Sequence, residues 1–341
     1  MLAHSIEEYM QTKLMHELGH EVFSIGAYID PRAPGDDKRP ALPEVPFHAD
    51  LAAAVSRAQP PADMPDDRLW GAKDRLPDEV IDWADVVICH HVEWRWLAGG
   101  NFARLKDAGK RVIWRTVGQS THENEARMAE LRRDGLEIVR YSPKERAIPY
   151  FAGEDALIRF WMDPAEYGGW VGNDVRVGNV TQDMRGRAAW TGWDFWQMAT
   201  QGLDTYPAGP RSDEWGGAGA LTYDDLKAYL RSIRAYLYTG TFPASYTLGF
   251  IEAMMTGVPI VVAGPRRWGR DFSGLPYGDK LFETHEFSAL WSDDPWKVSM
   301  MLRRLIHEPE WAAKIGARGR EVAIALFGKD VIAAQWREFL R

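Results

Sequence analysis

Apolar residues follow two spacings in this chain, and the two spacings meet in the stretch from Gly240 to Gly264. Thr247–Thr256 carries apolar residues at i, i+3 and i+7, which predicts a short helix that ends at Gly257. Val258–Val262 is an apolar run rich in β-branched residues and of strand length, as expected of a buried parallel strand. The order loop, helix, strand is therefore expected here.

The same two patterns alternate along the rest of the chain. Helices are predicted over Ile6–Leu18, Ala49–Arg57, Phe102–Ala108, Asn124–Arg133, Trp193–Thr200, Tyr223–Ser232 and Lys329–Leu340, with a short helix and a strand together over Val80–His90. Strands are predicted over Glu21–Ile25, Arg111–Thr116, Leu136–Tyr141, Ala156–Phe160, Val175–Val180, Leu203–Tyr206 and Ala235–Tyr238. The alternation of strands and helices indicates an α/β protein with doubly wound parallel sheets.

Two stretches interrupt this alternation. Asp30–Gly71 is rich in proline and aspartate and predicts a long surface excursion. Asp163–Asn173 (DPAEYGGWVGN) is the best candidate for a linker. The interpretation is a first domain over residues 1–165 and a second over 170–328, with the last helix (residues 329–341) packing back on the first domain.

Composition narrows the classes of protein that fit. A chain of 341 residues with 45% hydrophobic residues has room for two domains. No run approaches 18 apolar residues, and no basic leader opens the chain, so we expect a cytoplasmic protein without a transmembrane segment. The single cysteine, Cys89, fits a reducing compartment and a buried structural thiol.

Charge is unevenly distributed. The net charge of −8 argues against a generic nucleic-acid-binding surface. Residues 1–90 hold 8 Lys and Arg against 17 Asp and Glu, whereas residues 103–146 hold 11 against 7. The second segment is either a local basic face or a set of ordinary solvated helix surfaces.

The predicted helix at 247–256 supplies candidate chemistry. The N–H groups of residues 246–248 lie at its N-terminus, where unpaired donors and the helix dipole favour an anion. Glu252 lies one turn further in, where its carboxylate can accept hydrogen bonds from a hydroxyl-rich ligand. The alternative is a solvated helix glutamate beside an ordinary turn.

A zinc-peptidase pattern, H-E-x-x-H, occurs at residues 16–20. The pattern needs a helix that continues through both histidines and a third ligand. Gly19 and the strand-like residues after it end the helix at His20, and Glu44, the nearest third ligand, lies in a proline-rich loop. We therefore predict that His16 and His20 bind no zinc.

The central stretch also resembles the donor-binding signature of GT-B glycosyltransferases, especially the retaining group called family 4. The positions in register are Tyr246, Leu248, Glu252, Ala253, Met254, Gly257, Pro259, Ile260 and Val261. Two positions depart from the family pattern: Ala244 stands where the first of two paired glutamates would fall, and Thr247 replaces a glycine. Further motifs continue the resemblance over roughly residues 170–341.

The resemblance implies two Rossmann-like domains facing a central cleft and a nucleotide-diphosphate sugar as donor. It implies donor contacts at Gly178, Tyr246, Thr247 and Leu248, with Glu252 on the ribose. Arg185 and Arg187 would face the diphosphate and act in catalysis with Glu252, and Arg266, Arg267 and Arg270 are second choices. No D-x-D pair occurs, which fits GT-B enzymes that work without a metal, so no cofactor is expected.

The acceptor side is less defined. His91, Gln119 and His122 follow predicted strands, and Gly118-Gln119 stands where the family commonly has a histidine. Retention needs no general base, whereas inversion would use His91 or His122. The first half is similar in general layout to phage transferases that decorate modified DNA bases, while glycan, lipid and small-molecule acceptors stay open. The loss at Ala244 also leaves open a catalytically silent module that binds sugar nucleotides or a partner.

Overall fold

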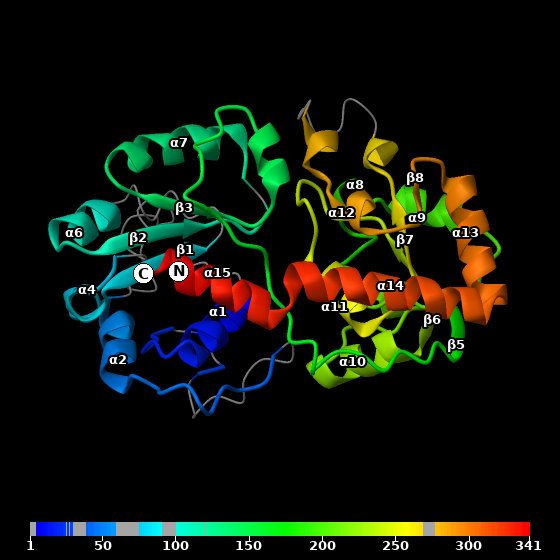
Figure 1. The fold of residues 1–341 in the computed structure, drawn as a ribbon, viewed down its shortest axis with the longest axis horizontal. Coiled ribbons are helices and arrows are strands. Elements are labelled where there is room, and N and C mark those ends of the chain that lie inside the picture. Colours follow the sequence, from blue (N-terminus) through cyan, green and yellow to red (C-terminus); the bar gives the residue numbers. More distant parts are fainter. Residues whose placement is uncertain are drawn as a thin grey trace. The chain divides into compact units, whose positions relative to one another are not determined.

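Two parallel four-stranded sheets, one in each half of the chain, organise the fold (Figure 1). The structure is a computed structural model, and it describes residues 5–24, 26, 28–29, 39–58, 75–90, 100–118, 120–268 and 277–341. The chain divides into two compact units, Met1–Ile158 and Arg159–Arg341. The predicted α/β class with two Rossmann-like sheets is confirmed.

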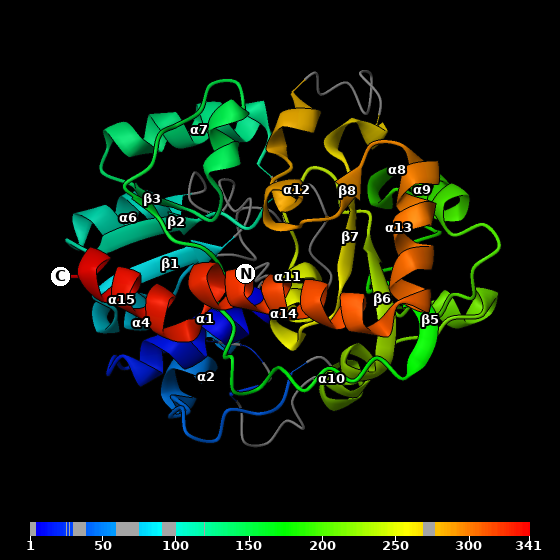
Figure 2. The ribbon, with the colours of Figure 1, turned by 45° about the vertical axis from the view of Figure 1, so that its right-hand side comes forward.

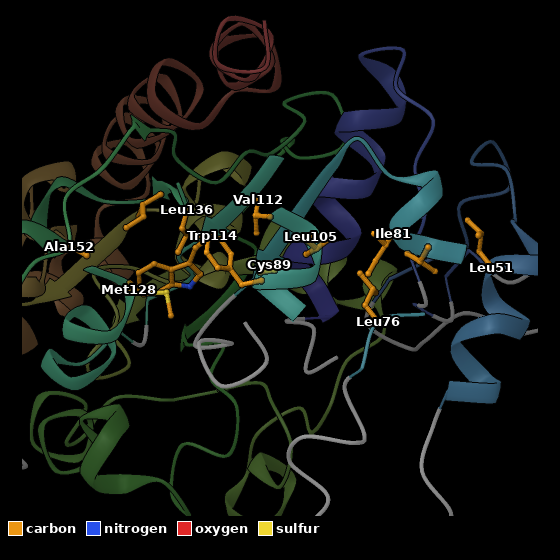
Figure 3. Close-up of a cluster of buried hydrophobic side chains, with 13 residues drawn as sticks. Leu51, Leu76, Ile81, Cys89, Leu105, Val112, Trp114, Met128, Leu136 and Ala152 are labelled. Atoms are coloured by element: carbon orange, nitrogen blue, oxygen red, sulfur yellow. The ribbon is translucent and has the colours of Figure 1, made fainter. Parts of the chain in front are cut away.

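The first unit has strands β1 (Val86–His90), β2 (Arg111–Arg115), β3 (Glu137–Arg140) and β4 (Ala156–Leu157), adjacent in that order. Its helices are α1 (Ser5–Glu17), α2 (Ala49–Ala58), α4 (Asp78–Trp83), α6 (Phe102–Asp107) and α7 (His122–Arg133), followed by a 3-10 turn, η2 (Pro143–Ala147). Because side chains alternate across a strand, Val112 and Trp114 of β2 share one face of this sheet. They meet Cys89, Leu105 and Met128 there in a buried apolar cluster (Figure 3), so Cys89 is a core residue as predicted.

The second unit has strands β5 (Asp174–Gly178), β6 (Ile233–Tyr238), β7 (Ile260–Ala263) and β8 (Trp291–Ser292), again adjacent in chain order. Its helices are α8 (Ala188–Thr191), α9 (Trp193–Ala199), α10 (Tyr223–Ser232), α11 (Leu248–Thr256), α12 (Thr284–Phe287), α13 (Pro295–His307), α14 (Pro309–Phe327) and α15 (Lys329–Phe339). Its described residues also include the 3-10 turns η3 (Ser212–Trp215), η4 (Pro265–Trp268) and η6 (Gly278–Leu281).

Helices cover both faces of the second sheet because both faces are apolar. Ala235 and Leu237 of β6 pack into a cluster with α9 and α13. The alternate residue Tyr238 contacts Phe250 of α11, with 4.7 Å between ring centroids. Helix α14 in turn runs alongside α11 (Figure 2). Helix α11 is therefore enclosed by β6 and α14 and is buried along nearly its whole length.

Three predicted strands were wrong in extent or in kind. Residues 21–24 form no strand and pair with no sheet in the described part of the chain, and the Ser24 hydroxyl donates to Glu8 of α1. The strand predicted over Ala156–Phe160 is paired only at Ala156–Leu157. The strand predicted over Leu203–Tyr206 makes one isolated parallel bridge to β5, between Thr205 and Val177. The Tyr229 hydroxyl takes up the Tyr206 carbonyl and the Asn179 N–H, which would otherwise continue the pairing.

The segment predicted as a linker, residues 163–173, lies after the boundary between the units and is fastened to the second unit. The Arg231 Nε donates to the Gly168 carbonyl at 2.8 Å, and the Trp170 indole donates to the Ile233 carbonyl at 2.8 Å. Helix α15 also belongs to the second unit. Its packing across the first domain stays a prediction, as does the linker at 163–173.

Within the described part of the chain, none of the helices combines the length and the apolar character needed to cross a membrane.

Candidate functional site

The N-terminus of α11 lies at the carboxyl edge of the second sheet, directly after the loop that leaves β6. Thr247 is extended (φ −119°, ψ 162°) and caps the helix without a side-chain hydrogen bond. The first N–H groups of a helix have no acceptor within it, and the helix dipole adds partial positive charge there. The nine-residue helix ends at Gly257, whose φ of 90° is the left-handed conformation predicted for its cap. This part of the sequence prediction is confirmed.

Two further loops reach the same edge. A Cβ on Gly249 would lie 3.5 Å from the Val180 carbonyl oxygen, so the loop after β5 runs beside the first turn of α11. A Cβ on Gly209 would lie 2.0 Å from the Thr181 carbonyl oxygen, and its φ is 130°. Glycine at 209 is therefore required for the third loop to approach the second. The α11 N-terminus and these loops form the candidate site of the second unit.

Glu252 is the one charged residue of α11 and is only 3% exposed. Its Oε1 accepts a hydrogen bond from the Tyr167 hydroxyl at 3.0 Å. The alternative of a solvated helix glutamate is therefore wrong. A buried carboxylate is costly unless it is hydrogen-bonded, so Tyr167 belongs to the site even though sequence reasoning did not identify it.

The predicted phosphate-facing arginines lie in the loop between β5 and α8. Arg185 is exposed and Arg187 is half-buried, with its Nη1 donating to the Gln182 carbonyl at 3.4 Å. Arg211 joins them from the loop that Gly209 begins, because its Nη1 lies 3.6 Å from Asp183. Arg211 also pairs with Glu214, and it is a cation of this edge that the sequence did not single out.

The second-choice arginines follow β7. The backbone N–H of Arg266 donates to Asp293 at 2.7 Å, and its side chain is exposed. Arg267 belongs to the same 3-10 turn, and Arg270 lies outside the described residues.

Gly178 and Tyr246 have packing roles in the structure. A Cβ on Gly178 would lie 2.3 Å from the Tyr229 hydroxyl oxygen, so the close helix–strand approach requires glycine there. The Tyr246 ring is buried, and the Arg159 guanidinium lies 5.8 Å from its centroid. Their predicted donor contacts stay predictions.

A buried ion pair lies beside the position of the missing glutamate. The Glu283 N–H donates to the Ser245 carbonyl at 3.2 Å, next to Ala244. The Glu283 carboxylate pairs with Arg159, whose Nη1 donates to it at 3.1 Å. Arg159 also packs over aromatic rings, which fixes its position. The Glu283 carboxylate is therefore engaged in this ion pair, while the Glu283 N–H holds the loop before α11.

The carboxyl edge of the first sheet carries its own polar network. Arg140 is fully buried and donates to both oxygens of Glu125 at 2.7 Å. Glu145 accepts from the Thr116 hydroxyl at 2.9 Å, and burial raises its pKa to about 7. Burial also raises the pKa of Glu7, beside Arg115, to about 7. These groups fix the loops that end β2 and β3.

Only one of the three acceptor-side candidates is described. His91 and Gln119 lie outside the described residues. His122 begins α7 and is 39% exposed, with its Nε2 at 2.8 Å from Glu123. His122 is therefore partly accessible to a ligand at the start of the helix.

The helix that the zinc-peptidase pattern requires stops before the second histidine. Helix α1 ends at Glu17, and the Gly19 N–H closes a turn onto the His16 carbonyl, so His20 lies beyond the helix. Among the described residues, no three His, Cys, Asp or Glu side chains come together as metal ligands. The prediction of no zinc stays a prediction for the whole chain.

Comparison with known proteins shows similarity in fold. No family model matches the chain, and no curated protein matches it. The structure is similar to sucrose-phosphate synthase from Thermosynechococcus elongatus, with a TM-score of 0.58 at 16% identity over 84% of this chain and 81% of that one. It is also similar to a glycosyltransferase from Rickettsia africae, with a TM-score of 0.59 at 11% identity over 83% and 84% of the two chains.

A third similar structure contains ligands. HepE from Anabaena, in complex with UDP and glucose, has a TM-score of 0.56 at 13% identity over 77% of this chain and 80% of that one. The chain therefore has the two-domain α/β fold of GT-B glycosyltransferases.

Proposed function

We propose that this protein is a glycosyltransferase that moves a sugar from a nucleotide-diphosphate sugar to an acceptor hydroxyl. The observation that carries the proposal is the α11 N-terminus at the carboxyl edge of the second sheet, with the buried Glu252 one turn inside it. The GT-B fold agrees with it, and one protein of similar fold, HepE, binds UDP-glucose.

The chemistry follows from charge. The departing diphosphate gains negative charge, which the N–H groups at 246–248 and the guanidinium groups of Arg185 and Arg187 would stabilise. Arg211 is a further cation at the same edge. Glu252 would accept hydrogen bonds from the ribose hydroxyls, so it contributes to binding of the donor.

We further propose transfer with retention of configuration and without a metal ion, as in the family 4 group that the central stretch resembles. An inverting route would need a general base, and His122, exposed at the start of α7, would be tested first with His91. The stereochemistry of the released product distinguishes the two routes.

For the acceptor we propose a hydroxymethylated base in DNA, with glycans, lipids and small molecules as the alternatives to test. The excess of basic residues over 103–146 agrees with a polyanion near the first unit. A reducing compartment such as the cytoplasm agrees with the single buried Cys89. Incubation with a labelled donor and each acceptor class in turn identifies the product.

The test of the function is a thermal-shift screen against nucleotide sugars, followed by hydrolysis of the donor that binds. A ligand at 100 times its Kd stabilises the folded state by roughly 2.7 kcal/mol, which a melting curve detects. Glu252→Ala should lose the shift, and Glu310→Ala, an exposed change on α14, should keep it. If no nucleotide sugar stabilises the protein, the proposal is wrong.

The second candidate is a catalytically silent module that binds sugar nucleotides. Ala244, where the related pattern has a glutamate, favours this candidate, because Glu283 nearby is paired with Arg159. Tight donor binding without hydrolysis or transfer to any acceptor would select it.

A further inference from the structure

We infer that Tyr167 is a positioning residue for Glu252, and that its hydroxyl holds the carboxylate in the orientation that receives the ribose of the donor. The inference rests on the proposed function. Tyr167 is 4% exposed and Glu252 is 3% exposed, and their oxygens lie 3.0 Å apart. A phenol donating to a carboxylate is a charge-assisted hydrogen bond, stronger than one between neutral groups.

Tyr167 lies in a segment that is held by several hydrogen bonds besides its own bond to Glu252. We call residues 163–172 the strap. The Arg231 guanidinium donates to the Gly168 carbonyl at 2.8 Å and to the Glu166 carbonyl at 3.3 Å, on either side of Tyr167. The Arg320 guanidinium donates to the Pro164 carbonyl at 2.9 Å, further back along the strap.

The remainder of the strap is equally constrained. Gly168 has a φ of 133°, and a Cβ there would lie 3.1 Å from the Arg320 guanidinium, so glycine permits the close approach. Trp170 is held by its indole N–H on the Ile233 carbonyl at 2.8 Å. Both flanks of Tyr167 are held in place, so its hydroxyl has a defined position. The Glu252 side chain has three rotatable bonds, and the hydrogen bond to this hydroxyl restricts its orientation.

The hydrogen bond from Tyr167 goes to Glu252, the residue of α11 that we assign to the donor ribose. Glu252 is the one charged residue of the helix, whose other residues are apolar apart from Gly249 and Thr256. The Thr256 hydroxyl donates to the backbone carbonyl of Glu252 at 2.8 Å, so its hydrogen is used within the helix and does not contact the Glu252 carboxylate. A phenylalanine at position 167 would fill the same space. The tyrosine hydroxyl adds the hydrogen bond that orients the Glu252 carboxylate. Groups held in place before binding lose less freedom when the ligand arrives.

The experiment compares Tyr167→Phe with a matched control. Tyr223→Phe removes a phenol that donates to Glu166 of the same strap, and it leaves the Glu252 contact untouched. Titration calorimetry measures the Kd of uridine diphosphate and of its 2′,3′-dideoxy analogue for wild type and both variants, with adenosine and guanosine diphosphate and their dideoxy analogues in parallel. Thermal unfolding records the fold of each variant.

We expect Tyr167→Phe to weaken the bound ribonucleotide about tenfold and to leave the dideoxy analogue unchanged, because only the ribose hydroxyls meet Glu252. Tyr223→Phe should change neither Kd. In a Glu252→Gln background, Tyr167→Phe should have a much smaller effect, since the oriented charge is already absent. A purely structural role for Tyr167 would lower the melting temperature without this dependence on the ribose.

Two negative results are distinguishable. If wild type binds a nucleoside diphosphate and Tyr167→Phe weakens both forms equally or neither, the inference is wrong and the proposed function stands. If wild type binds none of the nucleotides, the proposed function is wrong and the inference falls with it.

Discussion

Removal of the Glu252 carboxylate is the sharpest test of the donor site. In Glu252→Ala the ribose hydroxyls would lose a charged acceptor within a buried setting, which costs about 1–3 kcal/mol, or about 5- to 150-fold in Kd. The same change leaves the Tyr167 hydroxyl without this acceptor, so we also expect destabilisation of the fold by about 1–3 kcal/mol.

The two effects must be separated in the assay. Titration calorimetry at a temperature well below the melting point of the variant reports affinity for the folded protein alone. Glu252→Gln is the companion variant, since its amide keeps the volume and one acceptor oxygen and should lose less affinity. Unaltered affinity for the donor in folded Glu252→Ala would refute the assignment of the ribose to this residue.

Four other substitutions probe different parts of the molecule. Arg185→Ala and Arg187→Ala should lower kcat about 10- to 100-fold with little change in donor Kd, because their charge matters most as the diphosphate leaves; a matching loss of affinity in calorimetry would contradict this. Glu145 has a pKa raised by burial from 4.5 to about 7, so its contribution to stability is complete below pH 4.5 and is lost as pH rises through 7, by about 3 kcal/mol. Glu145→Gln should therefore flatten the pH dependence of unfolding between pH 5 and 7, and an unchanged slope in denaturant titrations would count against it. Gly209→Ala should destabilise by more than about 2 kcal/mol, because its Cβ would meet the Thr181 carbonyl at 2.0 Å in a left-handed conformation; a melting temperature equal to that of wild type would show that the loop relaxes.

The sequence by itself determined the elements whose signals are local. Helix α10 has the predicted bounds, Tyr223–Ser232, because Thr222 caps its start within three residues along the chain. Helix α11 and its glycine cap were predicted for the same reason, since helical hydrogen bonds join residues four apart. The prediction of an anion site at the α11 N-terminus came from the same local pattern.

Strand pairing depended on tertiary structure. Whether Ala156–Phe160 or Leu203–Tyr206 becomes a strand depends on a partner distant in sequence, and an apolar run does not identify that partner. Glu21–Ser24 has the composition of a strand but finds no edge to pair with among the described residues.

The polar contacts of the site were decided in the same way. Tyr167 and Glu252 are separated by 85 positions, and Arg159 and Glu283 by 124. A short sequence pattern contains information only about residues close together along the chain. These pairs form because the fold removes both partners from water, and each buried polar or charged group then requires the other. The sequence could therefore single out Glu252 as a candidate, and only the tertiary structure decided that Tyr167 would be its hydrogen-bond partner.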